Sequence, residues 1–101
     1  MKRLNLLLIV LGLTINGMAQ KFQEDVFHTA SGKTLKITCI KHASIMMEYD
    51  GKVLYFDPVI NMEPHTDFTT WPKANYIFVT HEHRDHFDPM ALTELRRNYT
   101  V

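Results

Sequence analysis

Three of the six histidines lie in one six-residue segment that follows an apolar run. Residues 81–86 read His-Glu-His-Arg-Asp-His, and Tyr-Ile-Phe-Val occupies positions 76–79. Neutral imidazole and carboxylate are the usual nitrogen and oxygen ligands of Zn²⁺, and both also suit iron and manganese. The helical zinc-protease pattern His-Glu-x-x-His would require a histidine at position 85, where Asp85 stands. What remains is His-x-His-x-Asp-His, which predicts a metal site.

The residues before this segment predict an antiparallel meander. Strands are expected at 26–28 and 34–40, followed by a hairpin of 45–49 and 52–56. Asp50-Gly51 between the hairpin strands is typical of a type I′ turn, because Gly tolerates positive φ. In the second strand, the alternation predicts that Leu35, Ile37 and Cys39 face the core while Lys36 and Thr38 face outward.

The meander ends at Asp57-Pro58. From 59 to 74, the apolar residues follow neither a helical nor a strand-like spacing. This loop contains Met62, His65, Phe68 and Trp71, which either line a substrate pocket or pack as ordinary loop side chains. Residues 75–80 are expected to form a strand that is apolar on both faces and therefore central in a covered sheet.

After the metal-capable segment, Asp88 and Pro89 predict an N-cap and first-turn proline for a helix over 90–97. Met90, Ala91, Leu92 and Leu95 are expected on its buried side. A rigid strand would thus fix the ligands, and the following loop would aim them.

The segment and its surroundings resemble the metallo-β-lactamase superfamily. Further matches lie, in the family's order, at Lys41-His42-Ala43-Ser44, at 48–56, at Asp57-Pro58 and at 75–80, so the resemblance covers about residues 35–97. They are most similar to the branch that contains ascorbate-6-phosphate lactonase and the N-acyl-phosphatidylethanolamine phospholipase D. The implied fold is α+β: the N-terminal half of an αβ/βα sandwich, built as a meander followed by strand, ligand loop and helix.

The resemblance also implies roles for the ligands. His81 and His83 would bind one metal, and Asp85 and His86 would bind a second; His83 replaces the glutamate of the di-iron branch, which favours a hydrolase. Asp85 would also orient the attacking water. The implied cofactor is zinc, with two ions in the full-length protein and iron or manganese as alternatives.

Two residues outside the segment have open roles. Asp57 matches an acidic residue at a strand end, where it would accept a hydrogen bond from a ligand imidazole; the alternative is a turn cap before Pro58. His42 matches a Gly-His segment of the lactonase-like branch, although Lys41 replaces the glycine. Both a role beside the substrate and a purely structural role are open for His42.

The implied activity is that of an exported hydrolase that uses metal-bound hydroxide on an ester, a lactone or a phosphodiester, since a metal lowers the pKa of water toward about 7. The alternative is an inactive fragment or remnant that binds metal weakly. The family's later ligands are a His, a bridging Asp and a further His, and no His follows His86. The chain is therefore expected to be truncated at its C-terminus, and unstable and inactive on its own.

The N-terminus has the pattern of a signal peptide. Lys2 and Arg3 precede an apolar run over 4–15, and Gly17-Met18-Ala19 supplies small residues for cleavage. Because the run is shorter than the ~20 residues that span a bilayer, we expect a removable peptide over 1–19, cleaved after Ala19. The domain would then be 20–101 and periplasmic; an uncleaved membrane anchor is the alternative.

The amino-acid composition limits the classes of partner that the protein is expected to bind. A hydrophobic content of 46%, a charged content of 22% and a formal net charge of zero are typical of a globular protein. They indicate neither nucleic acid nor, after signal cleavage, a membrane as a partner, and the family resemblance implies a small-molecule substrate. Cys39 is the only cysteine, which excludes an internal disulfide and predicts a small buried side chain.

Overall fold

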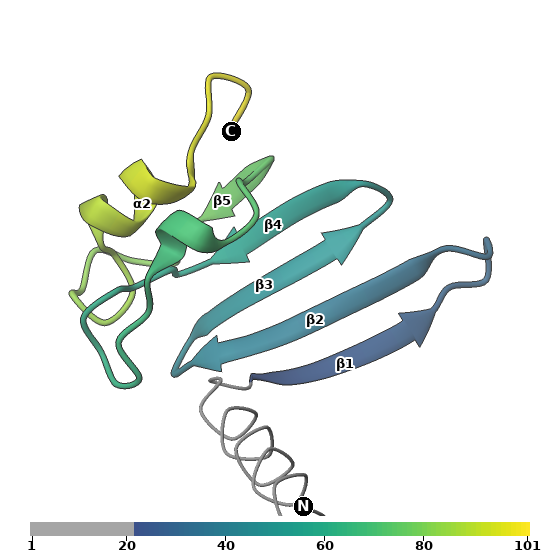
Figure 1. The fold of residues 1–101 in the computed structure, drawn as a ribbon, viewed down its shortest axis with the longest axis horizontal. Helices are drawn as coiled ribbons and strands as arrows, with labels where there is room; N and C mark the ends of the chain where they lie inside the picture. Colours follow the sequence, from purple (N-terminus) through teal and green to yellow (C-terminus); the bar gives the residue numbers. More distant parts are fainter. Residues whose placement is uncertain (1–21) are drawn as a thin grey trace, which may run out of the picture.

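The computed structural model describes residues 22–101. The predicted signal peptide 1–19 and its cleavage after Ala19 therefore lie outside the described residues. Five strands, one 3₁₀ turn and one α-helix follow one another: β1 Gln23–His28, β2 Thr34–Lys41, β3 Ser44–Tyr49, β4 Lys52–Phe56, η1 Phe68–Thr70, β5 Tyr76–Phe78 and α2 Pro89–Leu95. The strands form one sheet in the order β1-β2-β3-β4-β5, and α2 and η1 lie together near β4 and β5 (Figure 1). Within 22–101, no helix is long and apolar enough to cross a membrane.

The meander forms as the sequence predicts. β1 to β4 pair antiparallel with their neighbours, and Asp50 and Gly51 both have positive φ, at 51° and 73°, as a type I′ turn requires. β1 begins at Gln23, three residues before the predicted start. Its Glu24 forms an ion pair with Lys36 of β2, which also contacts Glu48 of β3, so this cross-strand pairing extends the sheet.

The covered face of the sheet is not the one that the alternation in β2 predicts. Thr38 of β2 lies opposite Met46 of β3, and Met46 lies opposite Tyr55 of β4. Thr38 is 2% exposed and Tyr55 is fully buried. The expectation that Cys39 is buried and Thr38 faces outward is therefore wrong. Ile40 is on the buried face with Thr38, and α2 and η1 pack there, so the side that the helix covers decides which residues are core.

The opposite face is apolar and uncovered by the described residues. Phe27 is 53% exposed, and Tyr76 and Phe78 of β5 are also exposed. Phe56 and Phe78 stack on one another, with ring centroids 5.0 Å apart. Such a bare inner face and its accompanying sheet edge are what half a sandwich would show.

β5 differs from the predicted central, covered strand. It spans only Tyr76–Phe78, pairs parallel with β4 and lies at the edge of the described sheet. On its other side, the Ile77 N–H donates to the Val101 carbonyl at 2.8 Å, and the Val101 N–H donates to the Asn75 carbonyl at 3.0 Å. The prediction was wrong for residues 22–101 because nothing in this range packs on the Tyr76–Phe78 face.

α2 begins where the cap residues predict and ends earlier. The Asp88 carboxylate accepts hydrogen bonds from the Met90 and Ala91 N–H groups and, through Oδ2, from Ile60 N–H at 2.8 Å, which ties the long loop to the helix start. Ala91 and Leu95 are fully buried, but Met90 is 62% exposed, so its predicted burial is wrong. The helix turns only one narrow side to the sheet, and Met90 lies outside it.

Aromatic residues of the loop mostly serve packing. Phe68 is fully buried, and its ring meets the rings of Tyr55 and Trp71 edge-on at centroid distances of 6.1 and 5.4 Å. For Phe68 and Trp71, the packing alternative therefore holds over the pocket alternative.

Candidate metal centre

The segment after β5 forms a compact turn that gathers the predicted ligands. The N–H groups of His86 and Phe87 both donate to the His83 carbonyl, at 2.9 and 2.7 Å, which folds the segment back on itself. The ring centroids of His81 and His86 come within 3.8 Å, and those of His81 and His83 within 4.7 Å. Ligand-capable atoms of His81, His83 and Asp85 all lie within 4.8 Å of one another. The structure thus brings the four predicted ligands together.

Asp57 lies buried behind this turn, at the end of β4. It is 1% exposed and has a positive φ of 46°, and its N–H donates to the Phe78 carbonyl of β5. Oδ1 accepts the Thr80 N–H at 2.7 Å, and Oδ2 accepts the Thr80 hydroxyl at 2.7 Å and the Nδ1–H of His86 at 2.8 Å. Burial alone would raise the pKa of Asp57, but these hydrogen bonds from Thr80 and His86 hold it below its usual value.

Thr80 is a site residue that sequence reasoning did not single out. Its hydroxyl donates to Asp57, so its oxygen is free to accept the Nδ1–H of His81 at 2.9 Å. Asp57 and Thr80 therefore hold the ring hydrogens of His86 and His81 on Nδ1, which leaves Nε2 as the lone-pair atom in each neutral ring. A short polar residue between an apolar strand and the first histidine was the available clue.

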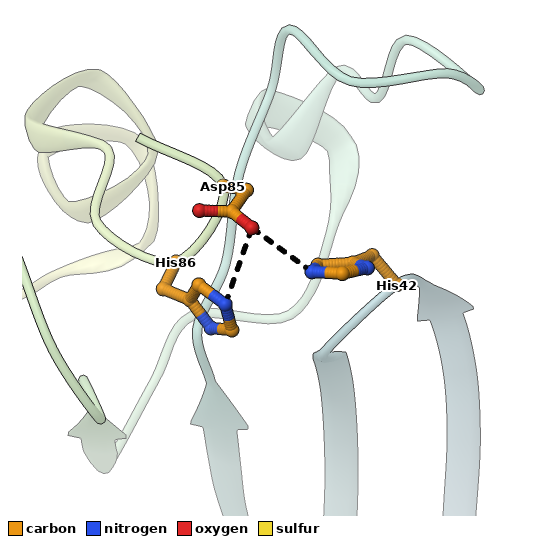
Figure 2. Close-up of side chains that lie close together, drawn as sticks. All are labelled: His42, Asp85 and His86. Carbon is orange, nitrogen blue, oxygen red and sulfur yellow. Dashed lines mark hydrogen bonds and ion pairs between the residues drawn. The ribbon is translucent and has the colours of Figure 1, made fainter. Parts of the chain in front are cut away.

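His42 reaches the same place from the turn between β2 and β3. Its Nε2 lies 3.1 Å from Oδ2 of Asp85, and Nε2 of His86 lies 3.3 Å from that same oxygen (Figure 2). His42, Asp85 and His86 thus form a second group whose ligand-capable atoms lie within 4.8 Å of one another. Partial burial raises the pKa of Asp85, but the hydrogen bond from its own backbone N–H and the two nearby histidines have a larger combined effect. The pKa therefore lies below its usual value, which favours the carboxylate form.

Lys41 anchors the turn between β2 and β3. Its ammonium group, in a buried side chain, donates to the carbonyl oxygens of Ile60, Met62 and Pro64 at 2.9–3.0 Å. Burial lowers the pKa of Lys41. The residue that replaces the glycine of the resembled family therefore ties the β2–β3 turn to the long loop, a role that the sequence analysis did not anticipate.

A hollow of about 490 Å³ opens beside Asp85. Its walls include Met62 of the long loop, Arg84 of the ligand turn and Phe87. Of the four loop residues considered for a pocket, Met62 lines this hollow, and the exposed His65 does not. His28 lies exposed on β1.

Comparisons with known proteins agree with this arrangement. Residues 36–101 match the model of the beta-lactamase superfamily domain. A UPF0173 metal-dependent hydrolase of Exiguobacterium sp. is 34% identical over 68 residues, which are 66% of this chain and 30% of that protein. A UPF0173 metal-dependent hydrolase of Flavobacterium johnsoniae is 44% identical over 55 residues, which are 52% of this chain and 24% of that protein.

A crystal structure shows the same fold. A candidate metal-dependent hydrolase from Parabacteroides distasonis superposes with a TM-score of 0.72 at 47% identity, over 78% of this chain and 34% of that one. This chain thus spans about a third or less of the length of each of these three proteins.

The sheet, the ligand turn and the buried carboxylate behind it define a protein of metallo-β-lactamase fold, represented here by its N-terminal part. The chain belongs to the beta-lactamase superfamily.

Proposed function

We propose that this chain provides the first ligands of a two-zinc centre in an exported hydrolase that cleaves an ester, a lactone or a phosphodiester. The observation that carries the proposal is the Asp57–Thr80 pair, which holds the Nδ1–H of His86 and of His81. Those two rings, His83 and the Asp85 carboxylate then present three nitrogen donors and an oxygen donor at one place. This donor set fits zinc, and it also accepts iron or manganese.

Each side chain has a defined task in this proposal. A metal bound here would lower the pKa of water and polarise a substrate oxygen. Asp85 borders the hollow, so its carboxylate can accept a hydrogen bond from the attacking water and orient it. Arg84 lines the same hollow and supplies a positive charge for a substrate's anionic group, which suits a phosphodiester. Asp57 keeps His86 in the tautomer that can bind metal.

Export and substrate size complete the proposal. Lys2, Arg3 and the apolar run over 4–15 support a signal peptide cleaved after Ala19 and a periplasmic location. A hollow of about 490 Å³ suits a small-molecule substrate. The bare apolar face of the sheet supports the further proposal that residues 20–101 alone are inactive.

The test uses the full natural protein. Its metal content is measured, and hydrolysis of nitrophenyl esters, lactones and bis(nitrophenyl) phosphate is assayed with and without a chelator. Asp85→Ala should lower the chelator-sensitive rate by about 100-fold or more. Glu82→Ala is the matched control, because Glu82 is exposed in the same turn and belongs to neither ligand group.

The competing function is a non-catalytic module that binds metal weakly. It is favoured by the small number of ligand-capable side chains that residues 22–101 gather at this place, namely His42, His81, His83, Asp85 and His86. Two tightly held metals per protein support the hydrolase, whereas one or none, together with chelator-insensitive rates, would refute it. Mass spectrometry of the periplasmic protein tests export, since a mature chain that starts at Met1 contradicts the signal peptide.

A further inference from the structure

The β2–β3 turn brings a third histidine to the pair formed by Asp85 and His86. Nε2 of His42 and Nε2 of His86 lie 3.1 and 3.3 Å from Oδ2 of Asp85, and Figure 2 shows both rings directed at that oxygen. Two ligand atoms that each lie 2.0–2.2 Å from a tetrahedral zinc ion are about 3.4 Å apart. The observed separations are therefore those of atoms that can share one ion.

The hydrogen on His86 supports this reading. Nδ1 of His86 donates to the buried Asp57 carboxylate, so in the neutral ring Nε2 presents a lone pair toward Asp85. In that form, the Nε2 lone pair of His86 and the Asp85 oxygen face one another at 3.3 Å, and a cation between them can bind both. His42 is the neighbouring side chain whose nitrogen can complete the set around such a cation, because its Nε2 faces the same oxygen.

The turn holds His42 in place at a conformational cost. His42 has a φ of 41°, in the left-handed region that Gly or Asn adopts more readily. Lys41, immediately before it, is anchored by three carbonyl oxygens of the long loop. A histidine kept in this backbone conformation on an anchored turn is preorganised toward Asp85, and backbone strain of this kind concentrates at functional sites.

We propose that His42 is a ligand of the metal that Asp85 and His86 hold, so that this metal takes three protein ligands from residues 42–86. The inference rests on the proposed function, since it requires that the protein binds two metals. It assigns the β2–β3 turn to the metal centre itself, where a substrate-side or purely structural histidine would leave metal affinity unchanged.

The experiment titrates Co²⁺ into the metal-free full natural protein and measures two dissociation constants and the visible spectrum. His42→Asn removes the imidazole while retaining a residue that tolerates positive φ. His42→Asn should weaken Co²⁺ binding at the site of Asp85 and His86 by on the order of 10–100-fold. Co²⁺ binding at the site of His81 and His83 should be unchanged. His65→Asn is the control, because His65 is exposed on the long loop, outside both ligand groups.

His42→Cys supplies the positive result. A thiolate at this position should bind Co²⁺ and add a sulfur-to-cobalt charge-transfer band that neither wild type nor His65→Cys shows. If His42→Cys does not fold, the dissociation constants of His42→Asn decide. Wild-type affinity in His42→Asn, or cobalt binding without the band in a folded His42→Cys, would overturn the inference. A wild-type protein that binds no Co²⁺ would instead overturn the proposed function.

Discussion

Replacing Asp57 by Asn tests whether the buried carboxylate controls the metal centre. In the wild type, one oxygen accepts the Thr80 N–H, and the other accepts the Thr80 hydroxyl and the His86 Nδ1–H. The amide nitrogen of Asn cannot accept hydrogen bonds, so His86 must move its hydrogen to Nε2 to accept one from the amide. That nitrogen would then carry a hydrogen where a metal ligand needs a lone pair.

Two magnitudes follow. Loss of a carboxylate behind a ligand histidine typically costs 10–100-fold in metal affinity, and the effect should fall on the metal held by His86. Of the three hydrogen bonds that the buried carboxylate accepts, the two at Oδ2 are lost or reversed when an amide nitrogen replaces that oxygen. At about 1.5 kcal/mol each, the free energy of unfolding should fall by about 3 kcal/mol.

The pH dependence provides a separate signature in the metal-free protein. Because hydrogen bonds hold the folded-state pKa of Asp57 below its usual value, its contribution to stability is complete above the unfolded pKa of about 3.9. It is lost as pH falls through the lower, folded value. Urea unfolding between pH 7 and pH 2 should therefore show a smaller acid-side decline for Asp57→Asn than for the wild type.

Asp67→Asn is the matched control for Asp57→Asn. Asp67 is exposed, accepts hydrogen bonds from Thr69 at the start of η1 and lies outside both ligand groups, so its replacement should leave metal affinity unchanged. Wild-type dissociation constants for both metals in Asp57→Asn, together with unfolding at the wild-type urea concentration, would contradict this role of Asp57.

Three further changes probe the supports of the site. Thr80→Val removes the hydroxyl between Asp57 and His81, and chelator competition should show metal binding about 10-fold weaker; an unchanged constant would contradict the role given to Thr80. Lys41→Met leaves three carbonyl oxygens without their donor, so urea unfolding should show a loss of about 2 kcal/mol and proteolysis should become faster near residues 60–64; equal proteolysis rates would argue against anchoring. Leu95→Ala opens a cavity under α2 and should cost about 2–5 kcal/mol in urea, with two metals still bound; a loss below 1 kcal/mol would mean that the helix is not part of the core.

Local patterns were predictable from the sequence. The Asp50-Gly51 turn and the Asp88-Pro89 helix start depend on neighbouring residues alone, and both form as expected. The superfamily could be inferred from residues 81–86 and their flanks, because ligand spacing after a strand is itself a local pattern. The comparisons with known proteins confirm that inference.

The features that the sequence did not predict share one cause, which is that they depend on tertiary contacts. β2 carries apolar side chains on both faces, and only the position of α2 and η1 makes Thr38 buried and Cys39 exposed. The hydrogen bonds between Thr80 and Asp57, and the anchoring of Lys41 by the long loop, join residues more than fifteen positions apart, so no short sequence window contains both partners. The family resemblance predicts a hydrogen bond from a ligand imidazole to Asp57, and the predicted ligand His86 makes that contact. The contact of His42 with Asp85 required the structure.

The bare face of the sheet also affects how such a protein is made in the cell. Residues 22–101 leave the ribosome before the rest of any longer chain, and the matched relatives are about three times as long as the region they share with it. During that interval, an apolar surface that includes Phe27, Tyr76 and Phe78 is exposed on the nascent chain. Chaperones can bind such a surface, and neighbouring nascent chains can aggregate through it. In a longer chain with a segment that covers this face, the yield of folded protein would depend on whether that segment is synthesised before the exposed surface aggregates. A variant that aggregates before this surface is covered would be scarce in the cell even if its equilibrium stability were unchanged.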